Sequence, residues 1–228
     1  MPSILITGAN RGLGLEFSRQ YAAAGWSVFA TCRHPEAASA LEDLRTVGDI
    51  RAIGLDVTDE ASIRRAAKQI ERPIDLLINS AGIGGPPDQR TGKVDYEAWH
   101  AVFDVNTMGP LRVTEAFIPH LERSERKLVV TITSGMGSIG DNSSGGSIAY
   151  RSSKAAVNMV MRSAAIDLKP RGIIAVVINP GWVKTDMGGA DAPLTAAQSV
   201  GAMKHLIGSL GPAQSGKFFN YDGREYPW

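Results

Sequence analysis

Short hydrophobic runs alternate with longer amphipathic stretches along almost the whole chain. The first six runs are apolar or β-branched at successive positions, which is typical of strands buried on both faces of a sheet. A seventh, shorter run lies near the end of the chain. The predicted strands are Ser3–Thr7, Ser27–Thr31, Ile50–Leu55, Ile74–Asn79, Lys127–Thr133, Ile173–Asn179 and Lys217–Phe219.

The amphipathic stretches between these runs are long enough to be helices that cross over from one parallel strand to the next. Their alternation with the strands predicts an α/β fold of the doubly wound, Rossmann type, with a mostly parallel seven-stranded sheet and helices on both faces. No linker or repeat interrupts the pattern, so we expect a single domain over residues 1–228. The predicted helices are Gly12–Ala24, Glu60–Ile70, Tyr96–Glu122, Ile148–Leu168 and Thr195–Leu210.

Composition and charge exclude several classes of function. The 228 residues include 24 basic and 23 acidic ones, which are interspersed and leave a net charge of +1. A nucleic-acid or anionic-membrane surface would need a basic stripe. The segment Met1–Ile6 lacks the features of a signal peptide, and the longest apolar run, Ile173–Ile178, is too short to span a membrane. We therefore expect a cytoplasmic protein with neither a nucleic-acid nor a membrane partner.

Metal and disulfide chemistry are also not expected. Cys32 is the one cysteine in the chain, so neither an intramolecular disulfide nor a cysteine-based metal site is predicted. The four histidines lie far apart in the sequence, with no pair at metal-ligand spacing.

A glycine-rich segment, Thr7–Gly14, follows the first strand directly and opens the first helix. Glycines allow a tight turn and a close approach of the backbone to a pyrophosphate, while the helix N-terminus offers free N–H groups. The alternative is a helix-entry turn without a ligand. If the segment binds a dinucleotide, the residues in contact are Gly8, Asn10, Arg11, Gly12, Leu13 and Gly14.

The spacing Gly-x-x-x-Gly-x-Gly resembles that of the short-chain dehydrogenase/reductase family, and the resemblance extends over nearly the whole chain. Further elements of the family follow in the expected order, although Ser80 replaces the second asparagine of its Asn-Asn-Ala-Gly motif. These elements are Asn79-Ser80-Ala81-Gly82, Asn106, Ser134, Tyr150-x-x-x-Lys154, and Pro180-Gly181 with Thr185.

The resemblance implies further contacts with a nicotinamide cofactor. Asp56 and Val57, after the third strand, would flank the adenine. The remaining expected cofactor contacts, besides Tyr150 and Lys154, are Asn79, Ala81, Gly82, Pro180, Gly181, Val183 and Thr185.

The end of the second strand favours NADP(H) over NAD(H). NAD-binding enzymes of the family usually have an acidic residue there, which would repel a 2′-phosphate. This chain has Arg33 instead and no acid before Glu36. Arg33 can form a forked, charge-assisted contact with the phosphate, and we expect Arg11 to approach it from the other side. Either arginine could also be an ordinary surface charge.

Tyr150 and Lys154 are the candidate centre of the chemistry. They lie four positions apart near the start of a predicted helix and so share one face. We expect the ammonium, together with an oxidised nicotinamide, to lower the pKa of the phenol, which would then act as general acid or base. Lys154 would also hold the nicotinamide ribose. Without the surrounding motifs, this spacing would be no more than a common surface pair.

Ser134 is the candidate for stabilising the carbonyl oxygen of a substrate. Thr133 and Ser138 are its rivals, and Ser134 is preferred because it stands just past the end of a strand. Asn106 would fix a water beside Lys154, which the family achieves with a distorted helix. Gly109-Pro110 makes a kink there expected.

The substrate side is less specific. Only a short segment, Trp182–Ala192, separates Pro180-Gly181 from the next predicted helix, which suggests an open cleft. The expected apolar wall is Trp182 and Met187, with Met136 and Ile83 opposite, although each could pack in the core instead. The expected substrate contacts are thus Ser134, Met136, Tyr150, Trp182 and Met187.

Several stretches resemble a narrower group, the sniffer-type carbonyl reductases and the bacterial C-factor-like proteins. They are Thr31-Cys32-Arg33, the segment from Asn179 to Gly189, and Asn220-Tyr221-Asp222-Gly223 with Trp228. This resemblance implies NADPH-dependent reduction of an aldehyde, ketone or quinone. The alternatives are an NADP-linked alcohol or hydroxyl dehydrogenase working oxidatively, and a dinucleotide-binding signalling protein. The family often dimerises through its two long central helices, so a homodimer or homotetramer is left open.

Overall fold

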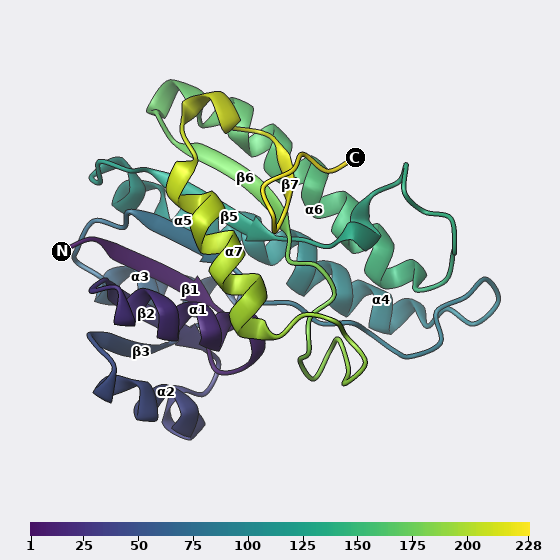
Figure 1. Cartoon of the computed structure of the whole chain (residues 1–228), viewed down its shortest axis with the longest axis horizontal. Coiled ribbons are helices and arrows are strands. Elements are labelled where there is room, and N and C mark those ends of the chain that lie inside the picture. The colour runs from purple at the N-terminus through teal and green to yellow at the C-terminus, as the bar shows by residue number, and fades with distance from the viewer.

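Seven parallel strands form one sheet in the computed structural model, which describes all residues from 1 to 228 (Figure 1). The strand order is β3-β2-β1-β4-β5-β6-β7, and every neighbouring pair is parallel. The order reverses between β1 and β4, which is where doubly wound sheets bind their ligands. The strands are β1 Ser3–Thr7, β2 Ser27–Cys32, β3 Ile50–Gly54, β4 Leu76–Asn79, β5 Leu128–Ile132, β6 Ile174–Asn179 and β7 Phe218–Asn220.

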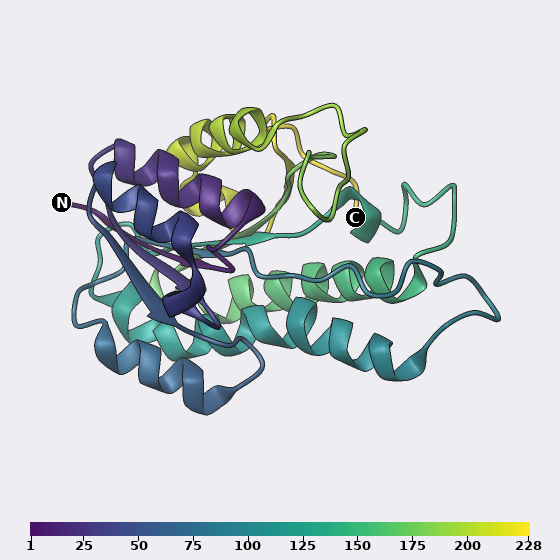
Figure 2. The ribbon, with the colours of Figure 1, turned by 90° about the horizontal axis from the view of Figure 1, so that it is seen from below.

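Helices cover both faces of this sheet. Figure 2 shows α1 and α7 on one face, with α3, α5 and α6 on the other. The helices are α1 Gly12–Ala23, α2 Ser39–Asp43, α3 Glu60–Gln69, α4 Tyr96–Phe103, α5 Gly109–Glu122, α6 Ile148–Asp167 and α7 Ala196–Ser209. No helix is both long and apolar enough to cross a membrane.

The two faces of the sheet bury separate hydrophobic clusters. Along β1, Ile4 and Ile6 pack in one cluster with Phe17 of α1, and Leu5 packs in the other with Phe117 of α5. All five side chains are fully buried. The central strands are therefore covered on both faces, which explains why they are apolar at successive positions, and the predicted fold class is confirmed.

The predicted helix Tyr96–Glu122 is interrupted in the structure. A π-helical turn, η3 Asp104–Met108, separates α4 from α5, and α5 begins at Gly109 directly before Pro110. The expected distortion is present, but it takes up a whole turn rather than a kink at Gly109-Pro110. The short helix α2 was not predicted, because its five residues bury only Leu41 and show no helical period.

Thr7, the last residue of β1, joins the two halves of the sheet where the strand order reverses. Its side chain is 1% exposed, and its hydroxyl oxygen accepts hydrogen bonds from the backbone N–H groups of Ser80 at 3.0 Å and Ala81 at 3.1 Å. One hydroxyl thus satisfies two donors of the segment that follows β4.

We predict that Thr7→Val destabilises the fold. Valine has nearly the same shape but no acceptor, so both N–H groups lose their partner, at a cost of about 1–3 kcal/mol in the free energy of unfolding. Urea denaturation measures this difference, and Thr7→Ser, which keeps the hydroxyl, is the matched control. Equal stabilities of the valine and serine variants would contradict the assignment.

Candidate active site

The candidate site lies along the edge of the sheet where the parallel strands end. The glycine-rich loop follows β1, Asn79 ends β4, Ser134 follows β5 and Pro180 follows β6. The first turn of α6 brings Tyr150 to the same edge. The topology therefore brings together residues that lie far apart in the sequence.

The glycine-rich loop has the shape of a cradle for an anionic group. Gly8 and Gly12 have positive φ values of 65° and 54°, and a Cβ on Gly8 would lie 2.8 Å from the Cα of Ala81. A Cβ on Gly14 would lie 2.3 Å from the carbonyl oxygen of Gly8. Arg11 occupies the N-cap position of α1, and no side chain caps that helix. The uncapped N–H groups fit a pyrophosphate.

The other expected cofactor residues near this loop differ in exposure. Asn10 is exposed and Leu13 is half-buried, whereas Val57 and Val183 are buried. The buried valines are covered by other residues of the protein: Val57 lies against Gly109, and Val183 forms an isolated backbone bridge with Leu194. Backbone groups of these two residues, rather than their side chains, are what a cofactor could contact.

The two arginines expected at the 2′-phosphate have different surroundings. Arg33, after β2, is exposed and forms no ion pair. Arg11 instead forms an ion pair of 3.1 Å with Asp186, in the segment that follows β6. Both partners are largely exposed, so this pair contributes little to stability and a bound anion could displace it.

Asp56 is held by its own loop. Its Oδ1 accepts bonds from the backbone N–H of Thr58 at 2.9 Å and from the Thr58 hydroxyl at 2.7 Å. Burial acts to raise the pKa of this carboxyl, but the bonds from Thr58 and the nearby Arg33 hold the pKa below its ordinary value. Asp56 is therefore ionised at neutral pH beside the free Arg33.

Tyr150, Ser134 and Lys154 form one cluster. The Ser134 side chain lies near enough to the Tyr150 phenol to lower its pKa, and the Ser134 oxygen accepts a bond of 3.1 Å from the backbone N–H of Met136. Lys154 is 5% exposed, and its Nζ lies 5.7 Å from the centre of the Tyr150 ring. The same ammonium donates to the carbonyl oxygen of Ile132 at 3.1 Å.

Burial sets the proton affinities of this pair. It raises the pKa of the Tyr150 phenol, and the nearby Ser134 offsets only part of that increase. The expected lowering of this pKa is therefore wrong for the polypeptide by itself, because burial has the larger effect. Burial also lowers the pKa of Lys154 from 10.5 to about 8.

Asn106, in the π-helical turn, binds the backbone rather than the lysine. Its amide accepts from the N–H of Ile83 at 2.9 Å and donates to the carbonyl oxygen of Ile83, also at 2.9 Å. It also donates to the Ser153 hydroxyl at 3.0 Å. Asn106 and Lys154 nevertheless both lie beside Gly82. A Cβ placed on this glycine would be 3.4 Å from the Asn106 Oδ1 and 3.7 Å from the Lys154 Nζ.

The two rivals of Ser134 are engaged elsewhere. The Ser138 hydroxyl donates to the carbonyl oxygen of Trp228 at 3.3 Å and accepts from the N–H of Asp141 at 3.1 Å. Thr133 is buried, and its hydroxyl donates to the carbonyl oxygen of Lys154 at 3.4 Å. Ser134 is the one of the three whose side chain influences the Tyr150 phenol.

The expected substrate wall lies at the open side of the site. Trp182 and Met187 are 57% and 53% exposed, so neither packs in the core, and Met136 is half-buried. The Trp182 ring N–H donates to the carbonyl oxygen of Gly188 at 2.7 Å, which braces the segment internally. Met187 reaches towards Gly84, where an added Cβ would lie 3.8 Å from its Cγ.

Sequence reasoning did not identify Tyr226 or Gln89. The Tyr226 hydroxyl donates to Asp141 at 2.8 Å, and a Cβ on Gly135 would lie 2.8 Å from the same hydroxyl. The end of the chain thus covers the loop that follows Ser134. Gln89 is a buried amide next to the start of α6. No local motif marks either residue, because both act through long-range contacts.

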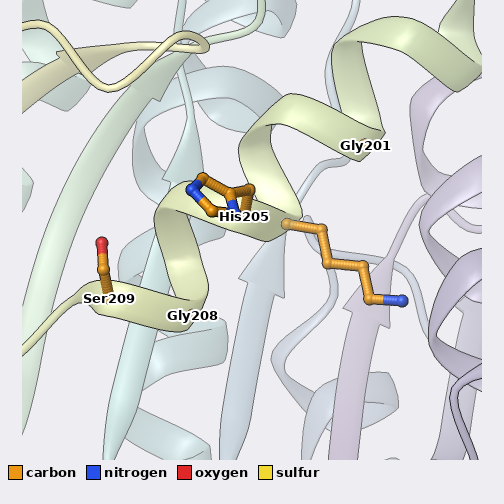
Figure 3. A pocket seen from close by; sticks show the side chains of 5 residues that line it. Gly201, His205, Gly208 and Ser209 are labelled. Atoms are coloured by element: carbon orange, nitrogen blue, oxygen red, sulfur yellow. The ribbon is translucent and has the colours of Figure 1, made fainter.

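A hollow of about 530 Å³ lies elsewhere, on the outer face of α7 (Figure 3). Gly201, Lys204, His205, Gly208 and Ser209 line it, and none of them belongs to the candidate site. The hollow arises because Gly201 and Gly208 have no side chains to fill the surface of the helix. The candidate active site therefore remains the one at the carboxyl edge of the sheet. No group of three or more histidine, cysteine, aspartate or glutamate side chains is placed to hold a metal ion.

A doubly wound sheet with a glycine cradle and a Ser-Tyr-Lys cluster at its carboxyl edge defines a dinucleotide-dependent oxidoreductase. Residues 2–193 match the short chain dehydrogenase family. The chain belongs to this family.

Two solved structures and one curated relative are similar to it. The carbonyl reductase Sniffer of Drosophila melanogaster is 36% identical, with a TM-score of 0.94 and all of both chains covered. An NADPH-bound carbonyl reductase from chicken fatty liver is 35% identical, with a TM-score of 0.92, and the match covers 100% of this chain and 99% of that one. The C-signal of Myxococcus xanthus is 49% identical over 68% of this chain and 93% of its own length. The expected resemblance to this group is confirmed.

The buried ammonium of Lys154 yields a prediction about stability. Between pH 8 and 10.5 the folded chain binds fewer protons at this group than the unfolded chain does, so its contribution to stability rises with pH. Below pH 8 the buried charge is a cost. Lys154→Met should therefore raise the free energy of unfolding at pH 7 by about 1–3 kcal/mol, and the gain should shrink towards pH 10.

Urea denaturation of wild type and variant from pH 6.5 to 10 measures this difference, and Lys68→Met on the exposed face of α3 is the control. A gain that stays constant across this range, or no gain at pH 7, would show that burial does not perturb Lys154.

Proposed function

We propose that this chain is an NADPH-dependent carbonyl reductase, formed by residues 1–228 as one catalytic domain, with Tyr150 as the general acid. The observation that carries the proposal is the cluster of Ser134 and Tyr150 beside the buried Lys154, at the sheet edge next to the glycine cradle. An aldehyde, ketone or quinone is the proposed class of substrate.

NADP(H) is the cofactor that the residues fit. The uncapped first turn of α1 and the positive φ angles of Gly8 and Gly12 suit a pyrophosphate. Arg33 is an unpaired cation where an NAD-binding chain would have an acid, so it suits a 2′-phosphate. Two relatives named as carbonyl reductases, one of them solved with NADPH, support this choice.

The residues would act as follows. NADPH, when bound, supplies a hydride to a carbonyl carbon. The Tyr150 hydroxyl gives its proton to the carbonyl oxygen, and Ser134 donates a hydrogen bond to the same oxygen as negative charge develops on it. Lys154 places a positive charge beside the phenol and favours its ionised form once the proton has left.

The raised pKa of Tyr150 favours the reductive direction. A phenol that keeps its proton at neutral pH is ready to act as an acid, and burial maintains that state. Oxidation of an alcohol would instead need the phenolate before the reaction begins. By the likeness to the NADPH-bound carbonyl reductase, we propose carbonyl reduction as the main direction and alcohol oxidation as the reverse reaction.

A signalling role is the second candidate, favoured by the likeness to the C-signal of Myxococcus xanthus. The connected Ser134, Tyr150 and Lys154 favour an enzyme, because a protein that only senses a dinucleotide has no need of a proton donor. Turnover of NADPH with a panel of aldehydes, ketones and quinones distinguishes the two, since a pure sensor would bind NADPH without oxidising it.

We predict that Tyr150→Phe lowers kcat with the best carbonyl of that panel by about a hundredfold or more, the usual scale for a lost general acid. The dissociation constant of NADPH, measured by fluorescence titration, should change little, because the phenol acts on the substrate. Comparable turnover in wild type and variant would exclude Tyr150 as the acid.

We predict that Arg33→Asp shifts cofactor preference from NADPH towards NADH. The change removes an attraction to the 2′-phosphate and adds a repulsion, and a lost charge-assisted bond is worth about 1.5–3 kcal/mol, or roughly ten- to a hundredfold in affinity. Measuring kcat/KM for both cofactors tests this, and Arg11→Ala, which should weaken NADPH without improving NADH, is the comparison. A wild type that prefers NADH, or an unchanged ratio in Arg33→Asp, would show that Arg33 is only a surface charge.

A further inference from the structure

Helix α6 carries Tyr150 in its first turn but has no cap of its own. The residue before it, Ser147, has left-handed backbone angles of φ 45° and ψ 41°, and its side chain forms no capping bond. The first N–H groups of a helix have no partner within the helix, and a side chain at the N-cap position usually accepts from one of them. At α6 these donors are satisfied by another part of the chain.

Gln89 accepts from two N–H groups of this first turn. The N–H of Tyr150 donates to the Gln89 Oε1 at 3.0 Å, and the N–H of Ile148 donates to the backbone carbonyl oxygen of Gln89 at 3.1 Å. The residue is only 5% exposed, although it lies in a connection outside the regular elements. A buried polar side chain of this kind needs all of its hydrogen-bonding groups satisfied.

The other end of the same amide is also used. Its Nε2 donates to the carbonyl oxygens of Gly84 at 2.9 Å and Pro86 at 2.5 Å. One side chain therefore joins the first turn of α6 to the segment 83–89, which follows Gly82 at the candidate site. The positive φ of Gly85, 75°, lets this segment fold back over the amide.

The segment 83–89 is thus fastened to α6 near both of its ends. At Ile83 the fastening runs through Asn106, which holds both backbone groups of Ile83 and also donates to Ser153 of α6. At the other end it runs through Gln89 to the backbone of Tyr150. This segment also faces Met187 of the substrate wall at Gly84.

We propose that Gln89 is a positioning residue of the reaction, which caps the catalytic helix from outside and fixes Tyr150 relative to the substrate-side segment 83–89. This inference rests on the proposed role of Tyr150. The cap sets where the first turn of α6 begins, and a displacement of about 1 Å of a catalytic group can cost a hundredfold in rate. The fastening of segment 83–89 sets the distance between the substrate wall and the phenol.

The experiment compares three variants of the full chain. Gln89→Met has a similar length and no side-chain amide, so it removes the bonds of the side chain to Tyr150, Gly84 and Pro86 and keeps the backbone bond to Ile148. Gln89→Glu keeps an acceptor for the Tyr150 N–H but places a carboxylate against the carbonyl oxygens of Gly84 and Pro86. Asp88→Asn, which breaks only an exposed ion pair with Arg90 in the same segment, is the control.

The measurements are hydrogen exchange at the Tyr150 amide and steady-state kinetics with NADPH and the best carbonyl. In Gln89→Met the Tyr150 amide should lose at least about tenfold in protection and kcat should fall about ten- to a hundredfold, with little change in the KM for NADPH. In Gln89→Glu the amide should stay protected, kcat should fall less, and the KM for the carbonyl should rise. Asp88→Asn should behave as wild type.

If the Tyr150 amide of Gln89→Met were as protected from hydrogen exchange as that of the wild type, the Gln89 side chain would not cap the helix. Lost protection with an unchanged kcat, while Tyr150→Phe is inactive, would reduce Gln89 to a structural role and overturn the inference. Full turnover in Tyr150→Phe would overturn the proposed function instead, and the exchange data would still report on the cap. If Gln89→Met does not fold, Gln89→Glu decides: a raised carbonyl KM with a protected amide supports the inference, and an unchanged KM overturns it.

Discussion

The buried ammonium of Lys154 is the constraint around which this site is built. A charged amine inside a protein is costly unless acceptors and packing compensate, and here burial brings its pKa down to about 8. The carbonyl oxygen of Ile132 at the end of β5 is its acceptor. The neighbouring backbone must also come close, because a Cβ on Gly137 would lie only 2.8 Å from the carbonyl carbon of Lys154. The bond of the ammonium to Ile132 and the close packing of Gly137 on the Lys154 backbone together fix the loop after β5 against α6, and with it Ser134 against Tyr150.

The site combines a rigid floor with an open rim. On the floor, hydrogen bonds join Asn106 to Ser153, the Tyr150 N–H to Gln89, and Lys154 to the carbonyl oxygen of Ile132. At the rim, Arg33 is unpaired, Arg11 is held only by an exposed ion pair, and Trp182 and Met187 face solvent. Catalytic groups benefit from rigid supports, whereas residues that bind a ligand gain from being free to meet it. This difference in function explains why the buried hydrogen bonds surround Tyr150, the proposed proton donor, while the proposed ligand-binding residues are exposed.

Local patterns in the sequence predict the fold and the main candidates well. Strands buried on both faces read as continuous apolar runs, and Gly8, Gly12, Tyr150 and Lys154 stand at spacings that their chemistry requires. Hydrogen bonds between distant segments leave no such trace: Gln89 meets Tyr150 across 61 positions, and Arg11 meets Asp186 across 175. For the polypeptide by itself, the expected direction of the Tyr150 pKa was wrong for a related reason, because desolvation depends on what packs around the phenol rather than on its nearest charged neighbour in the sequence.

The π-helical turn between α4 and α5 shows how a local loss of regular structure supports the site. Such turns are rare and often mark functional positions, because the extra residue turns a side chain out of the helical row. Here Asn106 lies in the turn and is 1% exposed, with its amide satisfied by Ile83 and Ser153. The Asn106 amide beside the catalytic helix is therefore satisfied by the protein itself. The N–H groups at the start of α1 and the guanidinium of Arg33 have no such partners, and both would bind a negatively charged group. In the proposed function, this asymmetry directs an anionic cofactor to the glycine loop and leaves a neutral carbonyl substrate to the hydroxyls of Ser134 and Tyr150.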